Sequence, residues 1–63
     1  MTGTMTVVIP TYNEAGNVIP MAKAIRQSYP DVKILFMDDG STDGTIDLVR
    51  NLGDPLTSIF VRE

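Results

Sequence analysis

Apolar runs of strand length occur three times along the chain. Met5–Pro10 is rich in β-branched residues and nearly continuously apolar, which is typical of a strand covered on both faces. Val32–Met37 is a second run of this kind. Leu56–Val61 is a weaker third run, because two hydroxyl side chains dilute it. We therefore predict three strands.

The segments between these runs carry apolar side chains at helical spacing. In the first segment the spacing predicts a helix over roughly residues 17–28, with Asn17 as its N-cap and Pro30 just beyond its end. In the second segment it predicts a helix of about nine residues, followed by Gly53 and Pro55 as stop signals. The polar residues able to cap this second helix are Ser41, Thr42 and Asp43.

The resulting order is strand–helix–strand–helix–strand, the α/β pattern of half a doubly wound nucleotide-binding sheet. Right-handed crossovers place the first two strands side by side and parallel. The segments Thr11–Gly16 and Asp38–Ser41 then both leave the carboxyl ends of adjacent strands. Because open α/β sheets bind ligands at that edge, we expect the two loops to form the ligand site.

The chemistry of the two loops favours a nucleoside over a bare pyrophosphate. Neither Gly-x-Gly-x-x-Gly nor Gly-x-x-x-x-Gly-Lys occurs in the sequence. The first loop instead offers Tyr12, whose ring can stack on a base, and Glu14, which can accept hydrogen bonds from ribose or base. Asp38 and Asp39 point to opposite faces if strand geometry holds through both, so at most one reaches the crevice. An aspartate there can accept an N–H from the edge of uracil or guanine.

Each of these residues also has a purely structural interpretation. Turns and caps use the same polar residue types as Asp39, Ser41 and Asp43. Tyr12 can pack against the first helix, and Glu14 is favoured near a helix N-terminus. Two kinds of cation site match the acidic residues only in part. An EF-hand calcium loop that starts at Asp39 would have Arg50 where the bidentate glutamate is required. The acidic end of the second strand also resembles the magnesium-binding aspartates of phosphoacceptor receiver domains, but no phosphoacceptor aspartate follows it in this sequence.

Composition narrows the classes of function. The 63 residues contain no cysteine and no histidine, which excludes the usual zinc and iron–sulfur ligands, cysteine nucleophiles and histidine bases. A net charge of −3 without a basic cluster argues against nucleic acid as a partner. No apolar run approaches the roughly 20 residues of a membrane span. Residues 1–4 lack the features of a secretory leader, so we expect a cytoplasmic location, with membrane association possible for a longer protein.

Two motifs together carry a resemblance to a known family. The segments are Val8–Glu14 (VIPTYNE) and Met37–Thr45 (MDDGSTDGT), joined by an amphipathic helix and followed by another. In this pairing the chain resembles the start of a family 2 glycosyltransferase of GT-A fold, in the dolichol-phosphate mannose synthase-like group. The resemblance covers nearly the whole chain.

The resemblance implies transfer of a sugar from a UDP- or GDP-sugar to a lipid-phosphate or saccharide acceptor, with inversion at the anomeric carbon. It also implies that the nucleotide-sugar is bound by Pro10, Thr11, Tyr12, Glu14, Met37 and Asp39. The family's metal-binding Asp-x-Asp and its catalytic base are absent from this sequence. We therefore expect no catalytic residue and no metal site in the chain, and Mg²⁺ or Mn²⁺ in a full-length enzyme.

A chain of this length is expected to be one incomplete unit. Sixty-three residues without disulfides bury too little apolar surface for high stability. We expect residues 1–63 to be the amino-terminal nucleotide-sugar-binding segment of a glycosyltransferase domain, inactive in isolation. Its partners would be the donor and either the remainder of that domain or a second copy of the chain. The alternative is a non-enzymatic nucleotide-binding or self-associating α/β module.

Overall fold

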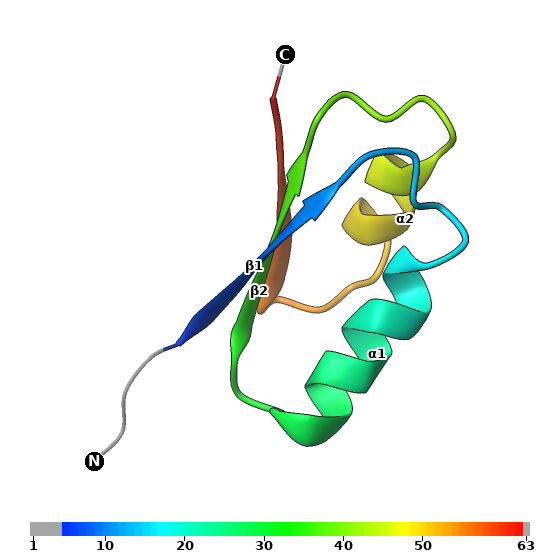
Figure 1. Ribbon diagram of the computed structural model, residues 1–63. Helices are drawn as coiled ribbons and strands as arrows, with labels where there is room; N and C mark the ends of the chain where they lie inside the picture. The colour runs from blue at the N-terminus through cyan, green and yellow to red at the C-terminus, as the bar shows by residue number, and fades with distance from the viewer. Residues whose placement is uncertain (1–4, 63) are drawn as a thin grey trace.

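The computed structural model describes residues 5–62 of the chain. Three strands alternate with two helices (Figure 1). Their bounds are β1 (Thr6–Thr11), α1 (Val18–Ser28), β2 (Lys33–Asp38), α2 (Thr45–Arg50) and β3 (Thr57–Val61). The predicted α/β class and order of elements are confirmed. The expectation about a leader concerns residues 1–4, which lie outside the described residues.

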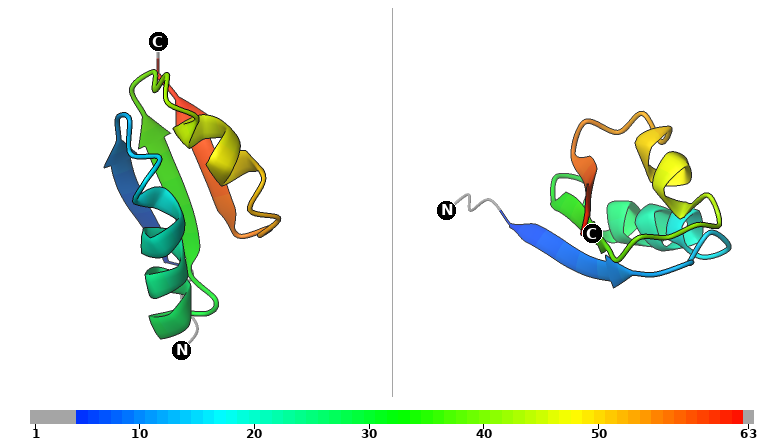
Figure 2. Two further views of the ribbon diagram at one scale, coloured as in Figure 1. Left: turned by 90° about the vertical axis from the view of Figure 1, so that its right-hand side faces the viewer. Right: turned by 90° about the horizontal axis from the view of Figure 1, so that it is seen from above.

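The three strands form one parallel sheet in the order β1-β2-β3. Ile9 is in register with Phe36, and Phe36 in turn with Ile59. Because the chain steps across the sheet in one direction, two right-handed crossovers place both helices on the same face, as Figure 2 shows. The carboxyl ends of all three strands therefore lie at one edge, and the predicted parallel pairing of the first two strands is confirmed.

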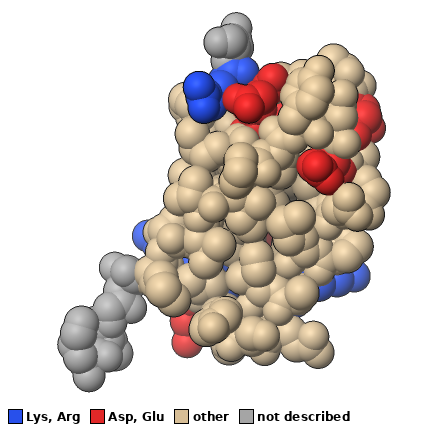
Figure 3. All heavy atoms as spheres, in the orientation of Figure 1, with Lys and Arg blue, Asp and Glu red and all other residues tan. Residues whose placement is uncertain are grey.

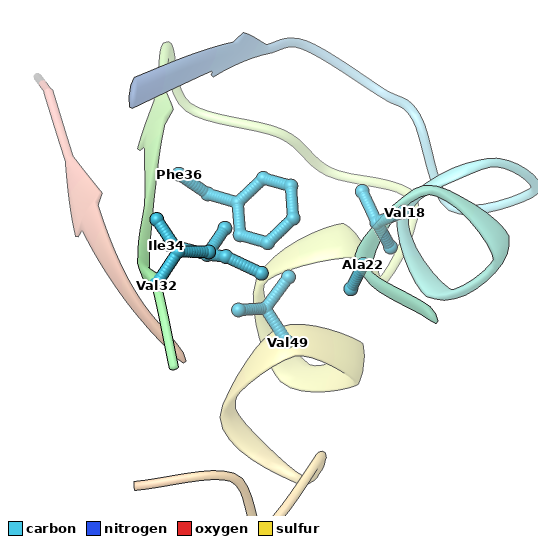
Figure 4. Packing of buried hydrophobic residues seen from close by; sticks show 6 residues of the cluster. All are labelled: Val18, Ala22, Val32, Ile34, Phe36 and Val49. Atoms are coloured by element: carbon cyan, nitrogen blue, oxygen red, sulfur yellow. The ribbon is translucent and has the colours of Figure 1, made fainter. Parts of the chain in front are cut away.

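The hydrophobic core lies between this face of the sheet and the two helices (Figure 4). Phe36 and Val18 are fully buried, and Ile34 is 1% exposed. Phe36 sits at the centre of the middle strand, so its ring meets side chains from both helices. The buried hydrophobic residues are Val18, Ala22, Val32, Ile34, Phe36 and Val49.

The opposite face of the sheet is open in the described part of the chain. Val8 is 56% exposed and Phe60 57% exposed, and Pro10 is exposed beside the half-buried Met37. The expectation that the first strand is covered on both faces is therefore wrong for residues 5–62. This face of the sheet is open because both crossover connections run over the other face.

The helix ends differ in detail from the sequence prediction. Asn17 does occupy the N-cap position of α1, but its side chain makes no capping bond and donates to Glu14 Oε2 at 3.0 Å. The second helix has six residues instead of about nine. Gly44 precedes it with a φ of 95°, and the backbone N–H of Thr45 donates to Asp43 Oδ1 at 3.1 Å. A glycine suits this left-handed position because it has no Cβ.

Arg26 connects the end of α1 to the segment that leads into β3. Its guanidinium donates to Asp54 Oδ2 at 2.8 Å and to the Pro30 carbonyl oxygen at 3.1 Å, and it also contacts the carbonyl oxygen of Val32. Asp54 in turn accepts the hydroxyl of Thr57 at 2.7 Å. These bonds fix the amino end of the sheet, opposite the edge at which the two loops meet.

Candidate functional site

The loops that follow β1 and β2 lie against each other at the carboxyl edge of the sheet. The first loop comprises residues 12–17 and the second residues 39–44. The backbone N–H of Asp39 donates to the Thr11 carbonyl oxygen at 3.1 Å, which extends the β1–β2 pairing into the loops. Acidic side chains gather near this end of the molecule, beside a basic group (Figure 3). The predicted convergence of the two loops is confirmed.

Asp38 is buried beneath the second loop and organises it. Its carboxylate accepts the Thr11 hydroxyl at 2.8 Å and the N–H groups of Gly40 and Ser41 at 2.9 and 2.7 Å. The Ser41 hydroxyl donates to it as well. Burial raises the pKa of Asp38, but the hydrogen bonds from Ser41, Thr11 and Gly40 lower it by more, so that its pKa lies below its ordinary value. Asp38 is therefore an ionised structural carboxylate.

Asp39 points the other way, as strand alternation predicts. Its side chain is 56% exposed, and the only ion pair it makes among the described residues is with Arg62. Arg62 Nε lies 3.6 Å from Asp39 Oδ1, and the Arg62 side chain is 64% exposed. An exposed pair at this distance is worth about 0–1 kcal/mol. The Asp39 carboxylate is thus open to a ligand.

The first loop places its candidate residues in different surroundings. Tyr12 is 58% exposed, so its ring is available for stacking. Glu14 is half-buried and accepts the Asn17 amide. Thr11 is 3% exposed; its hydroxyl donates to Asp38, and its carbonyl oxygen accepts the Asp39 N–H. The remaining two candidates, Pro10 and Met37, lie in register on the open face of the sheet.

Four hydrogen bonds hold the first loop against the second loop and against Thr45, the first residue of α2. The Asn13 N–H donates to Ser41 Oγ at 2.8 Å, and the Thr42 N–H donates to Asn13 Oδ1 at 2.8 Å. The Ala15 N–H donates to Asp43 Oδ2 at 3.0 Å. The Glu14 N–H donates to Thr45 Oγ1 at 3.0 Å. We call this set of four bonds the loop latch.

Sequence reasoning missed three residues of this edge. Arg62 directly follows the third strand, and the rule that located the other loops would have placed it at the same edge. Asn13 was not among the predicted site residues. Asparagine tolerates the left-handed conformation, and Asn13 adopts that conformation with a φ of 50°, so its residue type is a signal for such a position. Thr45 carries no signal in the sequence, because its partner is 31 residues away.

Within residues 5–62, no group of three or more acidic side chains comes together in a way that could hold a cation. No helix among the same residues is long and apolar enough to cross a membrane.

Acid pH is expected to destabilise the fold through three aspartates. The Thr45 hydroxyl and the Ala15 N–H hold the pKa of Asp43 below its ordinary value, although burial opposes them. The Thr57 hydroxyl, the Leu56 N–H and Arg26 lower the pKa of Asp54 likewise. Because these pKa values and that of Asp38 are depressed in the folded state, their stabilisation is present above the unfolded value of about 3.9 and is lost as pH falls through the folded values.

Urea unfolding between pH 7 and pH 2.5 measures this dependence. We expect a nearly constant free energy of unfolding down to about pH 4.5 and a progressive fall below it. The fall should be smaller in Asp38→Asn and Asp54→Asn, which cannot be protonated at those positions. An acid dependence identical in the wild type and both variants would contradict this explanation.

Comparisons with known proteins agree with this geometry. The model of the family "Glycosyl transferase family 2" matches residues 6–63. Polyprenol monophosphomannose synthase of Mycolicibacterium smegmatis is 49% identical over 39 residues, which are 62% of this chain and 15% of that protein. Glycosyltransferase AglE of Haloferax volcanii is 43% identical over 56 residues, which are 79% of this chain and 18% of that protein.

No solved structure matches the chain. The chain spans less than a fifth of the length of the two relatives. The family match, in contrast, covers all three strands and both loops of the candidate site. The chain belongs to glycosyl transferase family 2, and its parallel βαβαβ unit is the Rossmann-like half expected of a GT-A fold.

Proposed function

We propose that residues 1–63 are the donor-binding segment of an inverting glycosyltransferase that uses a UDP- or GDP-sugar. The observation that carries this proposal is that the Asp39 carboxylate and the Tyr12 ring are both exposed, on two loops that are joined by hydrogen bonds at the carboxyl edge of a parallel sheet. A base can stack on Tyr12 while its N–H donates to Asp39. Glu14 is the acceptor for ribose or base in this arrangement.

The acceptor of the sugar is proposed to be a lipid phosphate or a saccharide. The name of the mycobacterial relative, a polyprenol monophosphomannose synthase, supports the lipid phosphate. In an active protein, Mg²⁺ or Mn²⁺ would neutralise the charge that develops on the departing nucleoside diphosphate. The sequence contains no Asp-x-Asp, and we propose that this chain supplies donor binding and no catalytic step. We propose that the isolated chain does not turn over.

Calorimetric titration of the 63-residue chain with UDP, GDP and CDP tests the donor-binding role. We expect binding of UDP or GDP, and weaker binding of CDP, because the cytosine ring nitrogen opposite Asp39 is an acceptor instead of a donor. Asp39→Ala should weaken that binding about 10- to 100-fold, since a hydrogen bond to a charged group contributes roughly 1.5–3 kcal/mol.

Asp31→Ala is the matched control for this titration. It removes the same charge from an exposed residue that precedes β2, at the opposite end of the sheet. Its affinity for UDP and GDP should equal that of the wild type. Equal affinities of the Asp39 and Asp31 variants would overturn the assignment of Asp39.

The open sheet face favours one further candidate, a self-associating module. Val8 and Phe60 present apolar surface there, and both outer strands have an unpaired edge among the described residues. A second copy of the chain could cover this surface. Sedimentation over a range of protein concentrations distinguishes the two candidates, and a concentration-independent monomer would exclude the module.

A further inference from the structure

The polar residues of the two loops divide into two groups. The side chains of Tyr12 and Asp39 are exposed and take no part in the loop latch. In the other group, each side chain bonds to the opposite loop or to the helix behind it; its members are Asn13, Ser41, Asp43 and Thr45. Four of these six polar side chains therefore form hydrogen bonds within the protein.

Asn13 is the residue through which the first loop is held. Its N–H and its side-chain oxygen bond to two successive residues of the second loop, Ser41 and Thr42. It also adopts a φ of 50°, a conformation that asparagine accepts more readily than most residues. Its two neighbours in sequence are Tyr12 and Glu14, both proposed donor-binding residues. The position of Asn13 thus sets the positions of both.

Asp43 holds the same loop at a second point. One carboxylate oxygen accepts the Ala15 N–H, and the other accepts the Thr45 N–H and the Thr45 hydroxyl. Thr45 in turn accepts the Glu14 N–H. The backbone on both sides of Glu14 is therefore fixed from α2 and from the second loop.

We propose that Asn13 and Asp43 are positioning residues, which keep Tyr12 and Glu14 at a set separation from Asp39 before the donor arrives. This inference rests on the proposed function. A ligand that contacts two loops binds more tightly when the relative position of the loops is already fixed. Binding then does not have to offset the entropy cost of ordering the loops. Asn13 and Asp43 act on the donor through their neighbours and do not touch it.

Asn13→Gly and Asn13→Asp separate this role from simple stability. The glycine variant keeps the backbone N–H and tolerates the positive φ, but it lacks the oxygen that accepts the Thr42 N–H. The aspartate variant restores an oxygen at that place. Asn51→Gly is the control, because it makes the same chemical change at an exposed residue after α2.

The readouts are the dissociation constant for UDP or GDP at about 0.15 M salt, where exposed charges more than about 8 Å apart are largely screened, and the urea midpoint of each variant. We expect Asn13→Gly to weaken binding about three- to tenfold, the value of one intramolecular hydrogen bond, with the midpoint close to that of Asn51→Gly. Asn13→Asp should return the affinity to within about twofold of the wild type.

The outcomes that oppose the inference are distinct from those that oppose the proposed function. If the wild type binds the nucleotide and Asn13→Gly binds equally well, the positioning role is wrong. The same holds if the loss of affinity merely follows the fraction of unfolded protein, or if Asn13→Asp fails to restore it. If the wild type itself does not bind UDP or GDP, the proposed function fails first.

Discussion

Replacement of Asp38 by alanine is expected to destabilise the protein by about 2–4 kcal/mol, because it leaves several donors without a partner. The buried hydroxyl of Thr11 and the N–H groups of Gly40 and Ser41 all donate to this carboxylate. Alanine accepts none of them. The loss is about half of the stability expected for a domain of this size, roughly 3–9 kcal/mol.

Asp39→Ala is the natural control, since it removes the adjacent carboxylate from an exposed position. Its stability should stay within about 0.5 kcal/mol of the wild type. Urea unfolding followed by circular dichroism measures both variants. Equal midpoints for the two variants would show that Asp38 does not organise the second loop.

The largest effect on stability is expected from Phe36→Ala. Phe36 is fully buried on the middle strand, between both helices and the sheet. Truncation of a buried phenylalanine typically costs about 3–5 kcal/mol, from lost burial and from the cavity that remains. We therefore expect a large part of the population to be unfolded at 25 °C, measured as lost dispersion in the amide proton spectrum.

Phe60→Ala provides the comparison within the same sheet. Phe60 is 57% exposed on the open face, so its truncation should cost less than about 1 kcal/mol. If Phe60→Ala were as damaging as Phe36→Ala, the open face would be packed against something in solution. That result would favour the self-associating module.

The arrangement of elements could be predicted from the sequence because it depends on local patterns. Apolar runs such as Val32–Met37 and the spacing of Val18 and Ala22 each indicate one element, and the handedness of crossovers then leaves few topologies. The open face of β1 could not be predicted, because a consecutive apolar run reads the same whether one face is covered or two. The short α2 could not be predicted either, since Gly44 determines its start through a positive φ.

In the candidate site, too, some features could be predicted from the sequence and others could not. The opposite orientations of Asp38 and Asp39 follow from strand alternation, and the convergence of the loops follows from parallel pairing. The loop latch could not be derived, because Asn13 and Asp43 bond to partners 28 or 29 residues away from them. A sequence alone assigns such residues only a turn or cap, whereas the structure places them between the two loops.

We propose that the two loops at the carboxyl edge of the sheet bind the nucleotide of the donor. Titration of the isotope-labelled 63-residue chain with UDP and with GDP, followed by the backbone amide resonances, tests it most directly. We expect saturable shifts at Tyr12, Glu14 and Asp39, with little change around Asp31 at the opposite end of the sheet. Absence of shifts at millimolar nucleotide in a chain with a folded spectrum, or shifts confined to the amino end of the sheet, would contradict it.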